Sequence, residues 1–214
     1  MSLLEITGLT HSFGENLLYK NAGFTLNKGE HIGIVGQNGT GKSTLIKICT
    51  EQIIPDSGRI IWQPNITIGY LDQYAEIDHT LTMKEFLKSA FAKLFEIETQ
   101  VMQLYEKAAD GDMKNLELAA YYQEQLETHD FYSIDTAIER VANGLGLLAI
   151  GLDRPIIEMS GGQRTKVILA KLLLEKPDVL LLDEPTNFLD KDHVSSLKDL
   201  SLIHISEPTR QAEI

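Results

Sequence analysis

The stretch "GIVGQNGTGKST", residues 33–44, constrains this chain more than any other part of its sequence. It matches the pattern G-x-x-x-x-G-K-[ST] from Gly36 to Ser43, with a strand-like segment before it and helix-spaced apolar residues after it. Glycines let the backbone curl so that successive N–H groups face phosphate oxygens, and the following helix adds the positive end of its dipole. The pattern therefore predicts a phosphate loop, in which Lys42 reaches the β- and γ-phosphates of a nucleotide and Ser43 holds Mg²⁺. A plain glycine-rich turn is the alternative.

Short runs of alternating apolar and polar residues predict strands on both sides of this loop. Three runs lie within residues 3 to 35, separated by Gly-Glu and Lys-Gly turns, and "RIIW" and "ITIGYL" are two more. Further along, Pro177 breaks a helix before "VLLLDEP", a continuous apolar run typical of a buried parallel strand. A helix is expected directly after the loop, since four apolar residues have helical spacing: Leu45, Ile46, Ile48 and Cys49.

The segment from Met83 to about Leu145 has helical spacing almost throughout. A turn at residues 110–112 divides it, so we expect residues 83 to about 129 to form a helical hairpin that projects from the core. Between residues 96 and 135, ten acidic side chains stand against two lysines, a net charge of −8 that predicts a solvated acidic surface. The apolar stripe of the first part consists of Phe86, Leu87, Ala90, Phe91 and Leu94.

Composition narrows the class of protein. The 214 residues carry a formal net charge of −12, so the chain repels polyanions, and contact with nucleic acid would need a local basic patch, which is not apparent. The single cysteine, Cys49, cannot form an internal disulfide, which favours a buried thiol in a reducing cytoplasm. The N-terminal "MSLLEITGL" lacks the features of a secretion signal, and no apolar run reaches the ~18 residues needed to cross a bilayer.

Two further stretches carry groups that suit nucleotide chemistry. "VLLLDEP" puts Asp183 and Glu184 at the end of a strand, where an open α/β sheet gathers its ligand groups. A carboxylate there can bind Mg²⁺ and its neighbour can polarise a water molecule, whereas a buried acidic pair without a cation costs several kcal/mol. In "MSGGQRTK", Ser160 can cap the apolar helix that follows, and two glycines leave room for an anion. Taken alone, this second stretch is only a turn.

Together, the phosphate loop, "MSGGQRTK" and "LLLDEPTNFLD" resemble the nucleotide-binding domain of the ATP-binding cassette (ABC) superfamily, over about residues 3 to 190. The resemblance implies ATP and Mg²⁺ as cofactors and a P-loop α/β fold with an antiparallel β subdomain, a helical subdomain and an inserted helical arm. It implies that Glu184 is the catalytic base and that Gln73, in "GYLDQ", meets Mg²⁺ and the attacking water. Asp183, the Walker B acid, and Ser43 are the other implied metal ligands.

The resemblance also implies which residues bind the nucleotide. Phe13 corresponds to the aromatic residue that stacks on adenine, although an aromatic residue near a strand end is more often part of a core. The remaining positions form the Walker A loop, the signature and the D-loop: Gly36, Gln37, Asn38, Gly39, Thr40, Gly41, Lys42, Ser43, Thr44, Ser160, Gly161, Gly162, Gln163 and Asp190. In this family each ATP lies between the Walker A loop of one cassette and the signature of another, so a second cassette is an implied partner.

Two features are similar to the ABC-F branch of that family. Asn187 in "EPTNFLD" matches the ABC-F pattern better than the "EPTSALD" of transporters, and 86 residues separate Gln73 from Ser160, which leaves room for the arm that ABC-F proteins insert. Proteins of this branch carry two cassettes, lack membrane domains and act on the ribosome (rRNA and tRNA), where they modulate translation or give antibiotic resistance. An ATPase subunit of an ABC transporter and a nucleotide-dependent DNA-repair or structural scaffold are the alternatives.

The C-terminal stretch does not continue this pattern. His204 comes 20 residues after Glu184, too soon for the helix and strand that precede the γ-phosphate-sensing histidine of the family. "LSLIHISEPTR" instead resembles the translation of a transposase sequencing adapter. We therefore expect native sequence to end near Asp199, His204 to have no catalytic role, and the tail to pack poorly. The expected segments are residues 1–82 (β subdomain and P-loop core), 83–145 (helical subdomain with arm), 146–199 (signature and Walker B part) and 200–214 (non-native tail).

Overall fold

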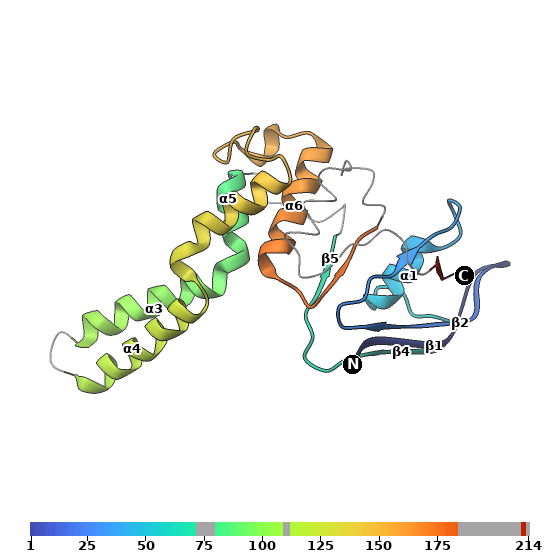
Figure 1. Cartoon of the computed structure of the whole chain (residues 1–214), viewed down its shortest axis with the longest axis horizontal. Helices are drawn as coiled ribbons and strands as arrows, with labels where there is room; N and C mark the ends of the chain where they lie inside the picture. Colours follow the sequence, from blue (N-terminus) through green and yellow to red (C-terminus); the bar gives the residue numbers. More distant parts are fainter. Residues whose placement is uncertain (72–79, 109–111, 184–210, 213–214) are drawn as a thin grey trace. The chain divides into compact units, whose positions relative to one another are not determined.

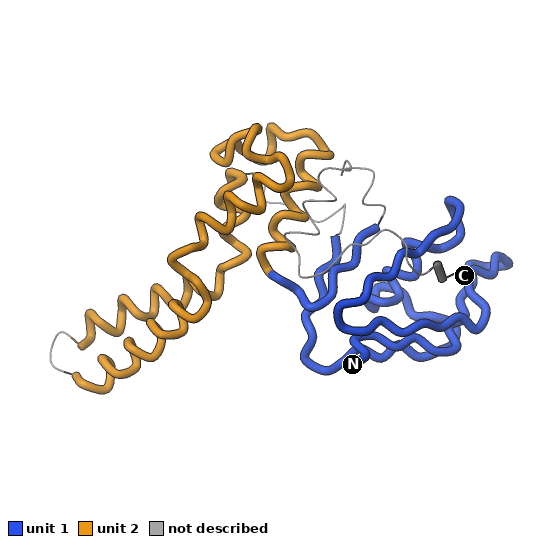
Figure 2. Tube along the Cα trace, in the orientation of Figure 1, with its two compact units in different colours: residues 1–75, 176–214 blue, residues 76–175 orange. Residues whose placement is uncertain are grey.

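The computed structural model describes residues 1–71, 80–108, 112–183 and 211–212, and the chain divides into two compact units. Met1–Ala75 and Lys176–Ile214 form the first unit, and Glu76–Glu175 form the second (Figure 2). In the described residues, the first unit consists mainly of strands around one helix, and the second consists mainly of helices (Figure 1). The chain therefore has the mixed α/β fold expected from its sequence.

An antiparallel sheet forms one side of the first unit. Its central strand, β1 (Ser2–Phe13), pairs with β2 (Asn16–Asn27) on one edge and with β4 (Ser57–Trp62) on the other. β1 and β2 are joined by a tight turn at residues 14–15, where Gly14 has a φ of +59°. These strands confirm the prediction made from the alternating residues on both sides of the loop.

A shift in register decides which residues of β1 face the core. Leu4 and Ile6 are buried because alternate residues of a strand share a face. Between Ile6 and Leu9 the pairing slips by a residue, and Gly8 there has a φ of +65°. The inward positions that follow are therefore Leu9 and His11.

Helix α1 (Lys42–Cys49) packs against this sheet. Its buried residues are the four expected from the sequence: Leu45, Ile46, Ile48 and Cys49. Trp62 of β4 donates a hydrogen bond from its indole Nε1 to the Cys49 carbonyl oxygen at 3.0 Å, which ties the end of the helix to the sheet. The core under the phosphate loop is thus continuous from β1 through α1 to β4.

Within its described residues, the first unit also contains two parallel pairings. β5 (Ile68–Tyr70) pairs with β6 (Val179–Leu181), which confirms the parallel strand expected for "VLLLDEP". β3 (Gly33–Ile34) pairs with β7 (Gln211–Ala212). Two residues of the tail thus continue a strand edge through backbone pairing, and the expectation that the tail packs poorly stays a prediction.

The second unit contains the helical hairpin that the sequence predicted. Within it α3 and α4 run antiparallel beside each other (Figure 1). The Tyr105 hydroxyl of α3 donates to Gln123 Oε1 of α4 at 2.7 Å, and Asp112 caps α4 by accepting from the Lys114 N–H at 3.0 Å. The helices are α2 (Met83–Lys88), η1 (Ser89–Phe91), α3 (Ala92–Ala108), α4 (Met113–Thr128), η2 (Phe131–Ser133), α5 (Ile134–Gly144), η3 (Ile156–Glu158) and α6 (Gly161–Glu175).

Helix α6 packs against α2, α5 and η1 within this unit. Lys171 of α6 lies over the Phe86 ring of α2, 5.1 Å from its centroid. From the sequence we expected this signature helix to share one segment, residues 146–199, with the Walker B strand. The signature helix α6 belongs instead to the same compact unit as the hairpin. The physical reason is its apolar face, which is buried against helices.

Candidate functional site: a phosphate loop beside an aromatic residue

The phosphate loop takes the curled form that its glycines predict. Gly39 and Gly41 have φ angles of +87° and +103°, in the left-handed region that favours glycine. Thr40 closes the loop by donating from its hydroxyl to the Gln37 carbonyl oxygen at 2.9 Å. A Cβ added to Gly36 would lie 2.7 Å from that hydroxyl oxygen, so the loop leaves no room for a side chain there. Its backbone conformation depends on these glycines.

Lys42 folds back over the loop. Its ammonium Nζ donates to the carbonyl oxygens of Gly36 at 2.9 Å and of Gln37 at 3.1 Å. An ammonium has three N–H donors, so these two bonds hold its position above the loop and leave one for a ligand. Lys42 and Ser43 are the first two residues of α1, where backbone N–H groups have no partner inside the helix. This arrangement suits an anion with several oxygens.

Tyr19 of β2 supports the loop through a hydrogen bond. Its hydroxyl donates to the Gly41 carbonyl oxygen, which also accepts from the Leu45 N–H at 2.9 Å. Tyr19 is 1 % exposed, and its burial raises its pKa to about 12, so the hydroxyl stays protonated and donates. A Cβ at Gly41 would lie 2.6 Å from the Tyr19 hydroxyl oxygen, so a glycine is required at this contact as well as by its φ.

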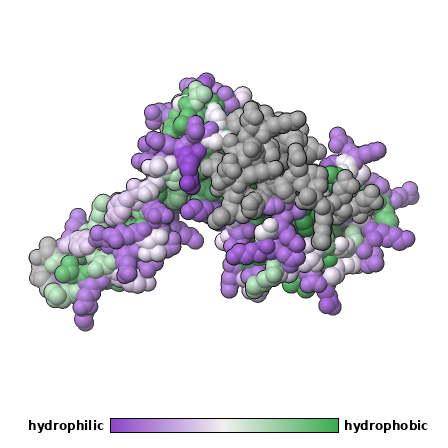
Figure 3. All heavy atoms as spheres, viewed as in Figure 1, coloured by the Kyte–Doolittle hydropathy of each residue, from purple (hydrophilic) through white to green (hydrophobic). Residues whose placement is uncertain are grey.

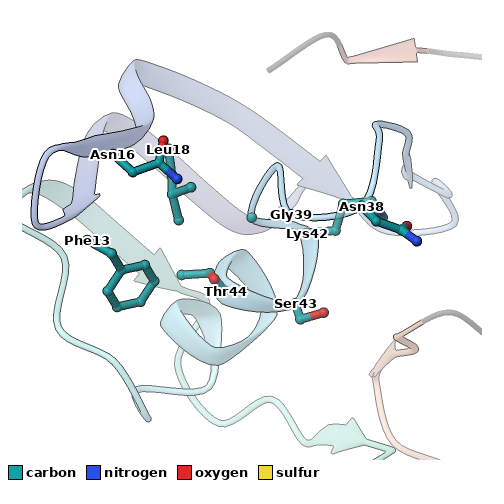
Figure 4. A pocket seen from close by; sticks show the side chains of 9 residues that line it. Phe13, Asn16, Leu18, Asn38, Gly39, Lys42, Ser43 and Thr44 are labelled. Atoms are coloured by element: carbon teal, nitrogen blue, oxygen red, sulfur yellow. The ribbon is translucent and has the colours of Figure 1, made fainter.

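An open cavity of about 240 Å³ joins the loop to Phe13 at the end of β1 (Figure 4). In that view, Phe13 and Ser43 lie on opposite sides of the first turn of α1. The cavity is lined by Phe13, Asn16, Leu18, Asn38, Gly39, Gly41, Lys42, Ser43 and Thr44. The structure thus brings an exposed aromatic ring and the start of α1 to one cavity. Gly36, Gln37 and Thr40 contribute to the loop through the hydrogen bonds described above.

The residues of this cavity fit a nucleotide with its metal ion. Its lining includes an aromatic ring, a lysine and a serine hydroxyl, which suit a base, a chain of phosphates and a hard cation. Asp183, the other expected metal ligand in the described residues, lies half-buried two residues after the end of β6. Among the residues that the structure describes, no group of three or more histidine, cysteine and acidic side chains gathers around a common point.

The signature residues start helix α6 in the second unit. The Ser160 hydroxyl accepts from the Gln163 N–H at 3.3 Å, and the Gln163 side-chain oxygen accepts from the Ser160 N–H at 2.9 Å. This reciprocal pair is a capping box and confirms that Ser160 caps the helix. A Cβ at Gly161 or Gly162 would meet nothing within 4 Å, and both residues are exposed, so this helix start is open to a partner or a ligand.

Several expected residues fall outside the described part of the chain: Gln73, Glu184, Asp190 and His204. Their roles stay predictions from the family resemblance. Three residues near the loop were missed by the sequence reasoning, namely Asn16, Leu18 and Tyr19. Leu18 and Tyr19 look like ordinary strand residues, and no local signal identifies their contact with a loop more than 20 residues away.

Comparisons with known proteins show which family the chain belongs to. The ABC transporter family model matches residues 19–187. The chain is 46% identical over 202 residues to "Uncharacterized ABC transporter ATP-binding protein YfmM" of Bacillus subtilis, covering 92% of this chain and 39% of that protein. It is 37% identical over 184 residues to "Energy-dependent translational throttle protein EttA" of Escherichia coli K12, covering 85% of this chain and 33% of that protein. It is 33% identical over 203 residues to "ABC transporter F family member 2" of Arabidopsis thaliana, covering 91% of this chain and 30% of that protein. The chain thus spans between three-tenths and four-tenths of the length of these relatives.

Solved structures share the fold. "Structure of ATP binding subunit of ABC transporter" matches with a TM-score of 0.62 and 21% identity, over 92% of this chain and 72% of that chain. The protein cbiO1 of Clostridium perfringens matches with a TM-score of 0.56 and 22% identity, over 93% and 72%. In the described ranges, no helix is both long and apolar enough to span a bilayer. The family model, the motifs and the relatives agree that the chain is an ATP-binding cassette of the ABC superfamily and belongs to its ABC-F branch.

Proposed function

We propose that this chain supplies one ATP-hydrolysing cassette of a two-cassette ABC-F protein, which acts in the cytoplasm on the ribosome to modulate translation or give antibiotic resistance. The observation that carries the ATPase part is the cavity that joins Phe13 to the phosphate loop. In this proposal Phe13 stacks on the adenine ring, and Lys42 binds phosphate oxygens through the donor that the loop carbonyls leave available.

The chain's own residues prepare the site for phosphate charge. The Lys42 ammonium is already held over the loop, so no reorganisation is needed when phosphate oxygens arrive. We propose that Ser43, Asp183 and Gln73 hold Mg²⁺, which when bound neutralises part of the phosphate charge. Glu184 is the proposed general base that takes a proton from the attacking water. The signature from Ser160 to Gln163 serves an ATP held by a second cassette, so this chain alone turns ATP over at a negligible rate.

Support for the ribosomal part comes from the hairpin. α3 and α4 present large apolar side chains to solvent: Met102, Tyr105, Met113, Leu116, Leu118 and Tyr121. Figure 3 shows hydrophobic side chains near the free end of the hairpin, among hydrophilic ones. Such a mixed surface suits a partner, and one relative is named as a translational throttle protein. Because the chain carries a net charge of −12, the ribosome contact is proposed to depend largely on parts outside this chain.

Sedimentation with ribosomes tests the proposal. The complete gene product carrying Glu184→Gln, which is expected to retain ATP, should pellet with ribosomes in the presence of ATP and much less in its absence. Deleting residues 96–130 should weaken this association while ATP binding remains, because the hairpin shares no residue with the cavity. Association with membrane vesicles in place of ribosomes would favour the alternative, an ATPase subunit of a transporter. ATP-independent pelleting, or none, would contradict the ribosomal proposal.

A further inference from the structure

A buried histidine stands against the exposed aromatic ring of the cavity. His11 and Phe13 both belong to β1, and their ring centroids lie 4.8 Å apart at an interplanar angle of 81°. This is the edge-to-face geometry that aromatic pairs favour. His11 is 5 % exposed and Phe13 is 52 % exposed, so the first ring is fixed inside the unit and the second reaches the cavity. The exposed Phe13 ring is therefore in contact with a buried ring.

The environment of His11 is not that of an ordinary core residue. Within the described residues, neither ring nitrogen of His11 has a hydrogen-bond partner, although both are buried. Its Nδ1 lies 3.6 Å from Asp56 Oδ1, which is an electrostatic contact but too long for a hydrogen bond. Burial of an imidazole without hydrogen bonds costs free energy that an apolar side chain would not. His11 instead makes two contacts, an edge-to-face contact with Phe13 and an electrostatic contact with Asp56.

Asp56 holds the same end of β1 with its other oxygen. Asp56 Oδ2 accepts from the Ser12 N–H at 2.8 Å and from the Ser12 hydroxyl at 2.7 Å. The Ser12 hydroxyl is the main cause that holds the pKa of Asp56 below its usual value, and the nearby His11 contributes in the same direction. The two carboxylate oxygens thus contact His11 and Ser12, the two residues that precede Phe13.

Asp56 also connects this strand end to the phosphate loop. It lies between the end of α1 at Cys49 and the start of β4 at Ser57. α1 begins with Lys42, so the helix that carries the loop leads within a few residues to the carboxylate that holds β1. Asp56 thus contacts the strand end that leads to Phe13, whereas Lys42 and the loop have hydrogen bonds of their own.

We propose that His11 and Asp56 are positioning residues for base recognition: Asp56 holds the end of β1, and the His11 ring holds Phe13 at the angle at which its face meets the base of the nucleotide. This inference rests on the proposed role of Phe13 and adds the residues that set its geometry. It predicts that their loss weakens binding of the base and leaves binding of the phosphates unchanged. A role limited to stability would affect both parts equally.

The test compares two ligands that share the phosphates but differ in the base. Affinities of the whole chain for Mg-ATP and for Mg-tripolyphosphate are measured by titration calorimetry. The variants are His11→Ala, His11→Phe, Asp56→Asn and Phe13→Ala, with Tyr19→Phe as a matched control that acts on the loop. Trp62 fluorescence checks that each variant keeps the fold of the first unit, since Trp62 packs against its core.

His11→Ala and Asp56→Asn should weaken ATP binding by about three- to ten-fold, the range of an aromatic pair, with tripolyphosphate affinity unchanged within about two-fold. His11→Phe should keep the preference for ATP, because a ring edge still meets Phe13. Tyr19→Phe should weaken the binding of both ligands by the same factor.

Equal losses for both ligands in His11→Ala, or no loss, would overturn the inference, as would a His11→Phe variant that behaves like His11→Ala. If Phe13→Ala abolishes the preference for ATP while the His11 and Asp56 variants keep it, the positioning role is wrong and the role of Phe13 stands. If the unmodified chain binds ATP no better than tripolyphosphate, both are wrong.

Discussion

The substitution Gly41→Ala examines how the phosphate loop is built. Gly41 has a φ of +103°, where an alanine costs about 1–2 kcal/mol through its Cβ. The new Cβ would also lie 2.6 Å from the Tyr19 hydroxyl oxygen, 3.1 Å from its Cζ and 3.3 Å from Leu18 Cδ1. Tyr19 cannot move aside easily, because its ring is rigid and it is 1 % exposed. Overpacking and the displaced hydrogen bond add about 1–2 kcal/mol, so we expect a total loss of about 2–4 kcal/mol in the free energy of unfolding.

Gly39→Ala is the matched control for this prediction. Gly39 has a similar φ of +87°, but a Cβ there would meet nothing within 4 Å. We therefore expect a loss of only about 1–2 kcal/mol, from backbone conformation alone. Urea unfolding followed by the fluorescence of Trp62, the single tryptophan, measures both variants in the first unit.

A double-mutant cycle separates the contact with Tyr19 from the backbone effect. Tyr19→Phe alone should cost about 1 kcal/mol through loss of its hydrogen bond to Gly41, and much less in the Gly41→Ala background, where that bond is already displaced. Equal losses for Gly41→Ala and Gly39→Ala, together with additive effects of the Tyr19 substitution, would refute the claim that Tyr19 supports the loop.

Three further predictions concern other parts of the chain. Lys42→Ala should weaken Mg-ATP binding by about ten-fold or more, the value of a charge-assisted contact, whereas Lys47→Ala, an exposed lysine of the same helix, should leave calorimetric affinity unchanged. Burial raises the pKa of Cys49 to about 11, so its reaction with a disulfide reagent at pH 8 should be at least ~100-fold slower in the folded chain than in urea, and fast reaction would contradict its burial. The Thr67 N–H and hydroxyl hold the pKa of Asp178 below its usual value; its stabilisation is therefore complete above the unfolded pKa of about 4 and is lost as pH falls through the lower folded pKa. Asp178→Asn should lower stability at pH 7 and less so at pH 3, and a constant difference across this range would count against the contact.

The features of the fold that could be predicted are those set by residues close together in sequence. The four buried residues of α1 follow from helical spacing, and the cap at Ser160 follows from its place three residues before Gln163. Phe13 could be assigned to the cavity through the family resemblance, and the structure brings it beside the loop.

The remaining features depend on contacts between residues far apart in sequence. Tyr19 meets Gly41 across 22 positions, and Ser12 meets Asp56 across 44. The register shift at Gly8, which turns His11 inward, also has no local signal, because an isolated glycine in a strand has several explanations. Such contacts follow from the tertiary fold, so spacing rules do not reveal them.

Photolabelling with 8-azido-ATP tests most directly whether the nucleotide binds with its base at Phe13 and its phosphates at the loop. The azide is on the base, so we expect labelling in the tryptic peptide of residues 1–20, which contains Phe13, Asn16 and Leu18. Excess ATP should prevent the labelling, and Lys42→Ala should strongly reduce it. Labelling concentrated in another peptide, or labelling that persists in Lys42→Ala, would contradict binding of the base at Phe13 and of the phosphates at the loop.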